Sequence, residues 1–370
     1  MTSYPIIVSA YRTIVAPRSS VLAPYDLGAL SAPVIQACLR AACVVADDVD
    51  EIIVSNALAA GGNPARFCAL AAGLPQRVAG LSIDRQCVGG LDTFQLGAAM
   101  IASGQANVVI VGGVESHSQR PLRMANTSGA AVAITYDRPA FSQHDDPDPD
   151  QAMAIVAAKH GLCQSDQDDW AIKSHQKARL YQSSLAYEIV EIGASGYIDP
   201  YARDLTEQIC RRAKKIAGSV TFANTAVAAD GAAFAIMMSA DFAESRGIQG
   251  VSFLGARTIG GDPTEPALAP VPAILDVLHQ FNIDPQSLDH VEMMEAYAAQ
   301  AMLCSSLTRL PSEAINQKGG ALARGHPIGA SGAILAVRLF HDLSGTSKTG
   351  LAAIAAAGGI GTAAVFRGRG

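Results

Sequence analysis

Short, continuous apolar runs alternate along the first third of the chain with segments that have helical periodicity. Apolar runs of about four to eight residues favour buried strands. We expect four such strands, at residues 5–10, 49–58, 81–84 and 107–113. The segments 27–42 and 89–103 have the length and spacing of helices. Continuous apolar strands separated by helices are typical of an α/β protein whose parallel sheet is covered on both faces.

The pattern becomes irregular and more polar from about residue 117 to residue 223. This region contains a Pro/Asp-rich segment at 141–153, which predicts turns, and a helical stretch at 167–185. The alternation resumes at 222–239, where we expect a helix that returns to a strand. The irregular region therefore looks like an insertion carried on a sheet scaffold.

The last part of the chain again predicts strands and helices in alternation. The expected elements are a strand at 251–260, a helix at 270–282, a strand at 289–296, and then a turn, helix, strand, turn and strand over 318–368. Near both ends of the chain, a Gly-rich turn precedes a helix of small residues and an apolar strand. This similarity suggests two related halves.

Composition and charge narrow the range of functions. The chain is 49% hydrophobic and 16% charged, so it can bury large cores. Its net charge of −6 argues against nucleic acid or an anionic membrane as the main partner. The first residues lack the pattern of a signal peptide, and no apolar run is long enough for a transmembrane helix. Seven cysteines without a C-x-x-C pair indicate a reduced, cytoplasmic protein.

Cys87 is the candidate nucleophile. It lies between the predicted strand 81–84 and a helix that begins with Gly89 and Gly90. At such a turn, free backbone N–H groups and the helix dipole favour the thiolate, so we expect a lowered thiol pKa. From composition alone, a buried structural cysteine is the stronger alternative.

His326 stands in a second Gly-rich turn, GHPIGASGA, which spans 325–333. Because Pro327 follows it, this histidine lies before the next helix rather than inside it. A histidine in a turn can act as general base for a thiol or donate to a developing oxyanion. A single histidine is more often structural, and no second ligand stands at metal-binding spacing.

A third Gly-rich segment, GGIG at 358–361, lies between two apolar runs. Too little chain follows it to complete a dinucleotide-binding unit. We interpret it as a hairpin turn whose N–H groups face a ligand.

Together these segments resemble the thiolase family along nearly the whole chain. The resemblance is carried, in family order and spacing, by VSAYRT, by DRQCVGG with VGGVES, by MEAYAAQ and by GHPIGASGA. It implies the thiolase fold, with duplicated αβαβα lobes and an inserted loop domain. The N-terminal lobe is expected at 1–116 and 224–250, the loop domain at 117–223 and the C-terminal lobe at 251–370.

The resemblance also implies roles for individual residues. Cys87 matches the cysteine that receives the acyl group from a thioester, and His326 matches the histidine that activates it. The backbone at Cys87, Ala357 and Gly358 matches the group that stabilises the tetrahedral intermediate. In the GHPIGASGA turn, Gly325 and Ser331 are assigned to substrate binding.

Three family positions are altered. Ala355 stands where thiolases carry a second catalytic cysteine, which shuttles the proton of the α-carbon. Met294 replaces the asparagine that orders a water beside the histidine. Ala226 replaces a serine that contacts the pantetheine of coenzyme A. The first two changes affect condensation and spare acyl transfer.

A basic cluster lies in the inserted region, at Arg211, Arg212, Lys214 and Lys215. We assign Arg211 and Arg212 to the phosphates of coenzyme A or to an acidic carrier protein. The alternative is a solvated charged face.

The sequence thus predicts an acyltransferase that carries an acyl group on Cys87, received from an acyl-CoA or acyl-carrier-protein thioester. The acceptor is open, and C–C bond formation is one outcome. No cofactor or metal is expected, and the family implies a homodimer or tetramer. The alternative is a thiolase-like scaffold that needs an accessory subunit.

Overall fold

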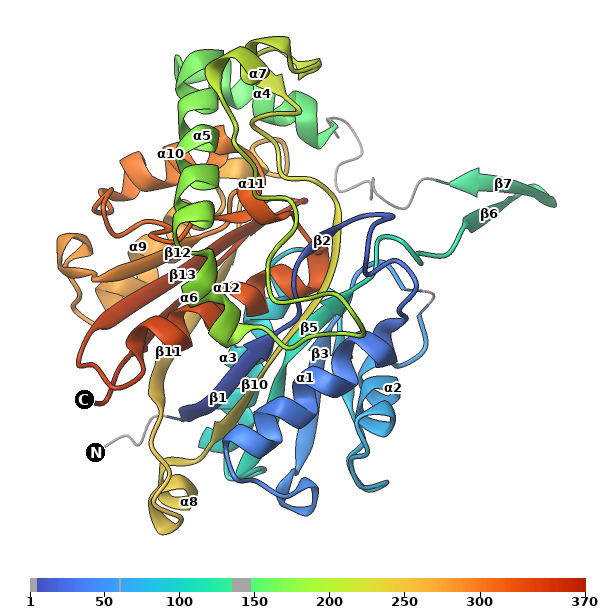
Figure 1. Ribbon diagram of the computed structural model, residues 1–370, viewed down its shortest axis with the longest axis vertical. Helices are drawn as coiled ribbons and strands as arrows, with labels where there is room; N and C mark the ends of the chain where they lie inside the picture. The colour runs from blue at the N-terminus through green and yellow to red at the C-terminus, as the bar shows by residue number, and fades with distance from the viewer. Residues whose placement is uncertain (1–4, 60, 135–147) are drawn as a thin grey trace.

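Five layers of helix and sheet make up the molecule (Figure 1). The computed structural model describes residues 5–59, 61–134 and 148–370. Two outer helix layers cover the two halves of one long sheet, and a third helix layer lies between these halves. This arrangement confirms the predicted αβαβα architecture.

The central sheet has, within the described residues, ten strands in the order β12-β13-β14-β11-β1-β10-β5-β3-β4, with β2 paired to β10. Two further hairpins, β6-β7 and β8-β9, lie outside it. The strands are β1 (Ile6–Arg12), β2 (Ala16–Pro17), β3 (Glu51–Ser55), β4 (Leu81–Ile83), β5 (Val108–Glu115), β6 (Arg123–Thr127), β7 (Ala130–Ile134), β8 (Lys215–Ala217), β9 (Val220–Thr221), β10 (Ala229–Met238), β11 (Val251–Gly260), β12 (His290–Met293), β13 (Thr349–Ala356) and β14 (Ile360–Arg367).

The helices divide among the three helix layers and the inserted region. They are α1 (Leu27–Ala41), α2 (Pro64–Ala71), α3 (Gly89–Ala102), α4 (Pro149–Lys159), α5 (Gln164–Leu180), α6 (Gln182–Leu185), α7 (Glu207–Arg212), α8 (Ala240–Ser245), α9 (Pro270–Gln280), α10 (Ala298–Thr308), α11 (Ala321–Arg324) and α12 (Ile328–Leu343). In the part of the chain that the structure describes, no helix is both long and apolar enough to cross a bilayer.

The sheet is mixed, so the prediction of a parallel sheet is wrong. β3 runs parallel to β4 and β5, and β12 runs parallel to β13, but the pairs β1-β10, β10-β5, β11-β14 and β13-β14 are antiparallel. Along β5, Val109 and Val111 pack toward the middle layer, whereas Val108 and Ile110 pack toward α1 and α2. Continuous apolar strands therefore report burial on both faces, which does not depend on strand direction.

The middle layer consists of α3 and α12, which pack against each other between the two halves of the sheet. Helices α1 and α2 cover the outer face of the N-terminal half, and α9 and α10 cover the outer face of the C-terminal half (Figure 1). Because α3 follows Cys87 and α12 follows His326, the packing of these two helices sets the distance between the two candidate residues.

The predicted helix before the strand β10 is absent from the described structure. The backbone there instead pairs with the candidate site, since the Ala226 amide donates to the Ala296 carbonyl at 2.9 Å and Thr225 bridges to Tyr297. These contacts satisfy the backbone groups of the segment, so an extended loop replaces a helix.

The inserted region forms helices α4 to α7 and two small hairpins, and the β6-β7 hairpin extends away from the body (Figure 1). The helical prediction for 167–185 corresponds to α5 and α6. In the Pro/Asp-rich segment, 141–147 lies outside the described residues, and α4 begins at Pro149. Buried ion pairs anchor the insertion: Glu188 accepts from Arg12 at 2.7 Å and from Arg338 at 3.3 Å.

Candidate active site

The turn that carries Cys87 is held in an unusual backbone conformation. Gln86, directly before it, has a φ of 53°, in the left-handed region that side chains rarely adopt. The Gln86 amide donates to the Asp84 carboxylate at 2.9 Å, and the Gly89 amide donates to the Gln86 carbonyl at 3.2 Å. This sharp strand-to-helix turn places Cys87 immediately before α3.

A glycine conformation and two hydrogen bonds hold the turn that carries His326. Gly325 has a φ of 111°, which favours glycine, and the His326 amide donates to the Val227 carbonyl at 2.8 Å. The first turn of α12 has no cap from its own side chains; the Gly329 amide donates instead to the Glu115 carboxylate at 2.9 Å. Glu115 thereby ties the start of α12 to the end of β5.

Glycines let the first turns of α3 and α12 touch backbone to backbone. A Cβ atom on Gly90 would lie 2.8 Å from the Gly329 carbonyl oxygen, and one on Gly332 would lie 2.3 Å from the Leu91 nitrogen. A larger residue at either position would push the helices apart. The close approach brings the Cys87 sulfur within 3.1 Å of His326 Nε2. Their roles as nucleophile and base stay predictions.

Ser331 determines how the His326 ring presents its nitrogens. His326 Nδ1 lies 2.6 Å from Ser331 Oγ, whose own proton is donated to the Pro327 carbonyl at 3.0 Å. Ser331 Oγ therefore accepts from Nδ1–H, which leaves Nε2 as the acceptor that faces the thiol. The Ser331 side chain is buried and holds the histidine, and its predicted contact with substrate stays a prediction.

Burial keeps both partners neutral in the resting site. It raises the pKa of the Cys87 thiol to about 12, with further contributions from the Glu115 and Asp84 carboxylates. Burial, together with nearby His117, lowers the pKa of His326 to about 3. The expected lowering of the cysteine pKa is therefore wrong: loss of solvent and two carboxylates outweigh the helix N-terminus. The site holds a thiol beside a neutral base rather than a preformed ion pair.

A cavity of about 210 Å³ opens over the pair. Its lining is largely apolar and comes from both lobes and from α4. The lining residues are Gln86, Cys87, Pro149, Met153, Thr225, Ala226, Pro266, Ala267, Ala296, Tyr297, Gln300, His326, Ile328, Ala355, Ala356 and Ala357.

Several predicted positions take part in this cavity. Ala226, Ala355 and Ala357 line it, and Ala357 stands in the turn between β13 and β14. Gly358 continues that turn with a φ of 80°. The stabilising role of the amides at Cys87 and Ala357 stays a prediction.

Other predicted positions lie away from the cavity. Met294 is buried in the core with 1% exposure, and Gly325 shapes the turn rather than the cavity wall. Arg211 and Arg212 are exposed on α7, where Arg211 pairs with Glu207 at 2.8 Å. Their proposed contact with a phosphate or an acidic carrier stays a prediction.

The structure adds residues to which the sequence analysis gave no role. Glu115 accepts four hydrogen bonds, from Asn56, from the Ala57 and Leu58 amides and from Gly329. Its signal in the sequence is a carboxylate at the end of a fully apolar strand. Asp150 accepts from the Tyr297 hydroxyl at 2.6 Å, an interaction between distant segments that no local pattern indicates.

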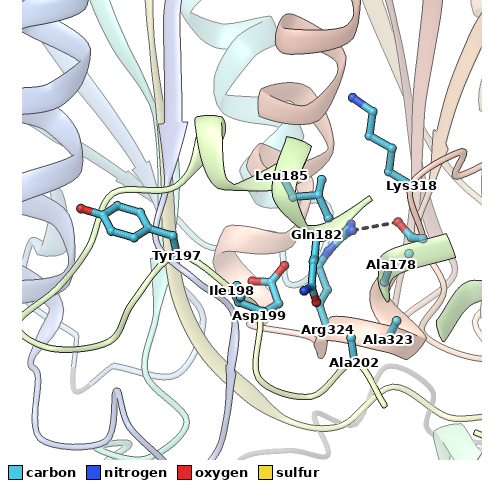
Figure 2. A pocket seen from close by; sticks show the side chains of 12 residues that line it. Ala178, Gln182, Leu185, Tyr197, Ile198, Asp199, Ala202, Lys318, Ala323 and Arg324 are labelled. Carbon is cyan, nitrogen blue, oxygen red and sulfur yellow. Dashed lines mark hydrogen bonds between the residues drawn. The ribbon is translucent and has the colours of Figure 1, made fainter. Parts of the chain in front are cut away.

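A second hollow lies between α5, α6 and α11, outside this site (Figure 2). Its volume of about 10 Å³ is room for a single water. Asp199 in its wall already accepts from Arg12 at 2.8 Å, and Arg324 donates to the Gly319 carbonyl. Within the described residues no cluster of His, Cys and carboxylate side chains could hold a metal ion. The cavity over Cys87 is the candidate active site because the facing thiol and imidazole line it.

The fold and the site together define a five-layered α/β protein in which a cysteine thiol faces a histidine ring at the starts of two packed helices. The comparisons identify the particular family. The model of the thiolase N-terminal domain matches residues 5–241, and that of the thiolase C-terminal domain matches residues 251–368. The chain belongs to the thiolase family.

Relatives and solved structures match the chain over nearly its full length. It is 37% identical to the "Putative acetyl-CoA C-acetyltransferase YhfS" of Bacillus subtilis, over 98% of both chains. It is 33% identical to the Staphylococcus aureus protein of the same description named VraB, also over 98% of both. The crystal structure of the Bacillus anthracis acetyl-CoA acetyltransferase superposes with a TM-score of 0.93 at 28% identity, over 99% of both chains. That of Acat5 thiolase from Ascaris suum in complex with coenzyme A superposes with a TM-score of 0.89 at 25% identity, over 99% of this chain and 100% of that one.

Proposed function

We propose that the protein is an acyltransferase that takes an acyl group from acyl-CoA onto Cys87 and passes it to an acceptor. The observation that carries this proposal is the 3.1 Å contact between the Cys87 sulfur and His326 Nε2, at the base of a largely apolar cavity. A thiol and a base within hydrogen-bond reach are the arrangement that nucleophilic catalysis requires.

The first half-reaction proceeds through two proton transfers. As Sγ of Cys87 attacks the thioester carbon, its proton moves to Nε2 of His326, and the S–C bond forms. The carbonyl oxygen becomes an oxyanion, for which the backbone N–H groups of Cys87 and Ala357 are the donors. When the C–S bond to coenzyme A breaks, the imidazolium returns the proton to the leaving thiolate.

Coenzyme A is the proposed carrier of the donor. Both relatives carry the name "Putative acetyl-CoA C-acetyltransferase", and the Ascaris suum thiolase structure contains coenzyme A. The cavity of about 210 Å³ is smaller than sites that hold drug-sized ligands, about 300–1,000 Å³. Its size favours a short acyl group.

The proposed acceptor is the α-carbon of a second acyl thioester, which gives C–C bond formation. This assignment follows the names of the relatives. An oxygen, nitrogen or sulfur acceptor would attack acyl-Cys87 in a second step, releasing the Cys87 thiolate, and would need no enolate.

Intact-protein mass spectrometry after mixing with acetyl-CoA and longer acyl-CoAs tests the proposal. We expect a mass gain equal to the acyl group in the wild type and in Cys43→Ala, which removes an exposed thiol, and no gain in Cys87→Ala. Acyl-carrier-protein thioesters are tested in parallel. If no thioester of either kind gives an adduct on Cys87, the proposal fails and the scaffold interpretation replaces it.

A further inference from the structure

Tyr297 and Asp150 form a hydrogen-bonded pair at the wall of the active-site cavity. The Tyr297 hydroxyl donates to Asp150 Oδ1 at 2.6 Å, joining the residue before α10 to the first turn of α4. Both side chains are half-buried, and Pro149, next to Asp150, lines the cavity together with Tyr297. A tyrosine anchored on a carboxylate can pass a proton to it.

Carbon–carbon bond formation needs a second group that accepts a proton. Acylation moves the proton of the Cys87 thiol, whereas condensation must also take a proton from the α-carbon of the acceptor. Cys87 and His326 serve the first transfer. Of the described residues that line the cavity, only Cys87, His326 and Tyr297 carry a titratable side chain, and Ala355 carries none.

Two unsatisfied polar atoms lie on the same side of the cavity as Tyr297. Thr225 Oγ1 and Gln300 Oε1 are buried and have no hydrogen-bond partner among the described residues, and Gln300 is 1% exposed. Thr225 bridges to Tyr297 through the backbone, and Gln300 follows Tyr297 by three residues at the start of α10. Buried polar groups without partners are rare in native proteins, and because both residues line the cavity, these atoms are available to a polar group of a ligand.

We infer that Tyr297 and Asp150 remove the α-proton of the acceptor thioester, with Tyr297 as the catalytic residue and Asp150 as the positioning residue that receives its proton. The inference rests on the proposed function and adds the second base. Burial, then Asp150, then Asp148 and Cys87, raise the pKa of Tyr297 well above its ordinary value. The phenol is thus protonated at rest. It transfers its own proton to Asp150 as it accepts the α-proton, and it does not act as a phenolate.

The proton balance of the cycle closes. The α-proton moves to the Tyr297 oxygen as the Tyr297 hydroxyl proton moves to Asp150. The enolate carbon then bonds to the acyl carbon, and the C–S bond to Cys87 breaks. The proton on Asp150 returns through Tyr297 to the Cys87 thiolate. During enolate formation the Thr225 hydroxyl can donate to the thioester oxygen on which the charge collects.

Exchange of α-hydrogens for deuterium tests this inference directly. Acetyl-CoA is incubated with the enzyme in D₂O, and deuterium in its methyl group is measured by mass spectrometry. The variants are Tyr297→Phe, Asp150→Asn and the matched control Tyr187→Phe, which removes a hydroxyl from an exposed tyrosine in the inserted region. Acylation of Cys87 is followed in the same samples.

We expect exchange in the wild type and in the control. Loss of a general base lowers proton-transfer rates about 100-fold or more, so exchange should fall by that factor in Tyr297→Phe and Asp150→Asn, far more than acylation falls. Because Ala355 lines the same cavity, adding Ala355→Cys to Tyr297→Phe supplies another base and should restore exchange. Such rescue would not follow from a merely structural defect.

The outcomes separate this inference from the proposed function. Exchange that survives Tyr297→Phe, or a wild type that acylates Cys87 without exchanging, overturns the role of Tyr297 and leaves the acyltransferase intact. Exchange that depends on Tyr297 without an adduct on Cys87 supports the role of Tyr297 and contradicts the acyl-enzyme. Absence of both exchange and adduct overturns both.

Discussion

Replacing Ser331 with alanine tests whether the orientation of His326 activates Cys87. The change removes one hydroxyl, which accepts from His326 Nδ1 at 2.6 Å and donates to the Pro327 carbonyl at 3.0 Å. No polar atom of the variant side chain can take over the Nδ1–H. His326 can then change tautomer, and in the other tautomer Nε2 carries a proton and cannot accept one from the thiol.

The size of the effect follows from burial of the bond. Leaving a buried donor without a partner costs about 1–3 kcal/mol. If this cost falls on the transition state for acylation, the rate of acyl-Cys87 formation drops by about 5- to 150-fold. The thiol remains in place, so the final adduct keeps its mass and only its rate of formation changes.

Rapid-quench mass spectrometry with acetyl-CoA measures this rate. Ser306→Ala is the matched control. The Ser306 hydroxyl also donates to a helix carbonyl, that of Leu303 at 3.2 Å, and this hydrogen bond does not involve a histidine. Thermal unfolding midpoints of both variants show how much stability each lost hydroxyl costs, so that a slower acylation caused by a less stable helix can be told from one caused by a misoriented histidine. If Ser331→Ala forms the acyl-enzyme within about twofold of the control, the histidine does not depend on Ser331 and the reasoning is refuted.

Three further predictions follow from burial and packing. Because burial raises the pKa of Cys87 to about 12, its alkylation by iodoacetamide should keep accelerating through pH 9; a plateau below pH 8 would indicate a thiolate–imidazolium pair. Gly332→Ala places a Cβ within 2.3 Å of the Leu91 nitrogen, so it should lower stability by about 1–3 kcal/mol and slow acylation, whereas Gly260→Ala, with open space around it, should do neither in urea unfolding and acylation assays. Burial lowers the pKa of His175 to about 3, below the unfolded value of about 6.5. The contribution of the neutral imidazole to stability is therefore present above pH 6.5 and lost as the pH falls toward 3. Urea titrations at several pH values should show that His175→Gln weakens this loss of stability in acid, and an unchanged loss would contradict the prediction.

The elements around the nucleophile could be predicted from sequence because their signals are local. The strand 81–84, the helix after Gly89 and the hairpin at Gly358 each depend on neighbouring residues, and the structure contains all three. Strand direction could not be predicted, since burial on both faces gives β10 and β5 the same apolar pattern as a parallel pair. The motif order, rather than the periodicity, correctly indicated the layered fold.

The protonation states of Cys87 and His326 could not be predicted from the neighbouring residues in the sequence. A cysteine before a glycine-rich helix suggests a lowered pKa, yet Glu115, which follows Cys87 by 28 positions in the sequence, lies close enough to raise it. Ser331 shows the same limit: its motif suggests substrate contact, and only the packed turn reveals that it orients the base.

The altered family positions gain a physical meaning only together. Ala355 in the cavity wall carries no titratable group and Met294 is buried in the core, whereas Tyr297 brings to the cavity a hydroxyl whose partner, Asp150, comes from the inserted region. From sequence, the changes at Ala355 and Met294 look like losses, and no local pattern assigns Tyr297 a role. In the folded chain Ala355 and Tyr297 line the same cavity, so a loss of function is not the simplest account of the altered positions. A cavity that had lost its chemistry would not need a thiol held 3.1 Å from a base or a tyrosine held 2.6 Å from a carboxylate. The retained geometry therefore favours a condensing enzyme with a relocated second base over an inactive scaffold.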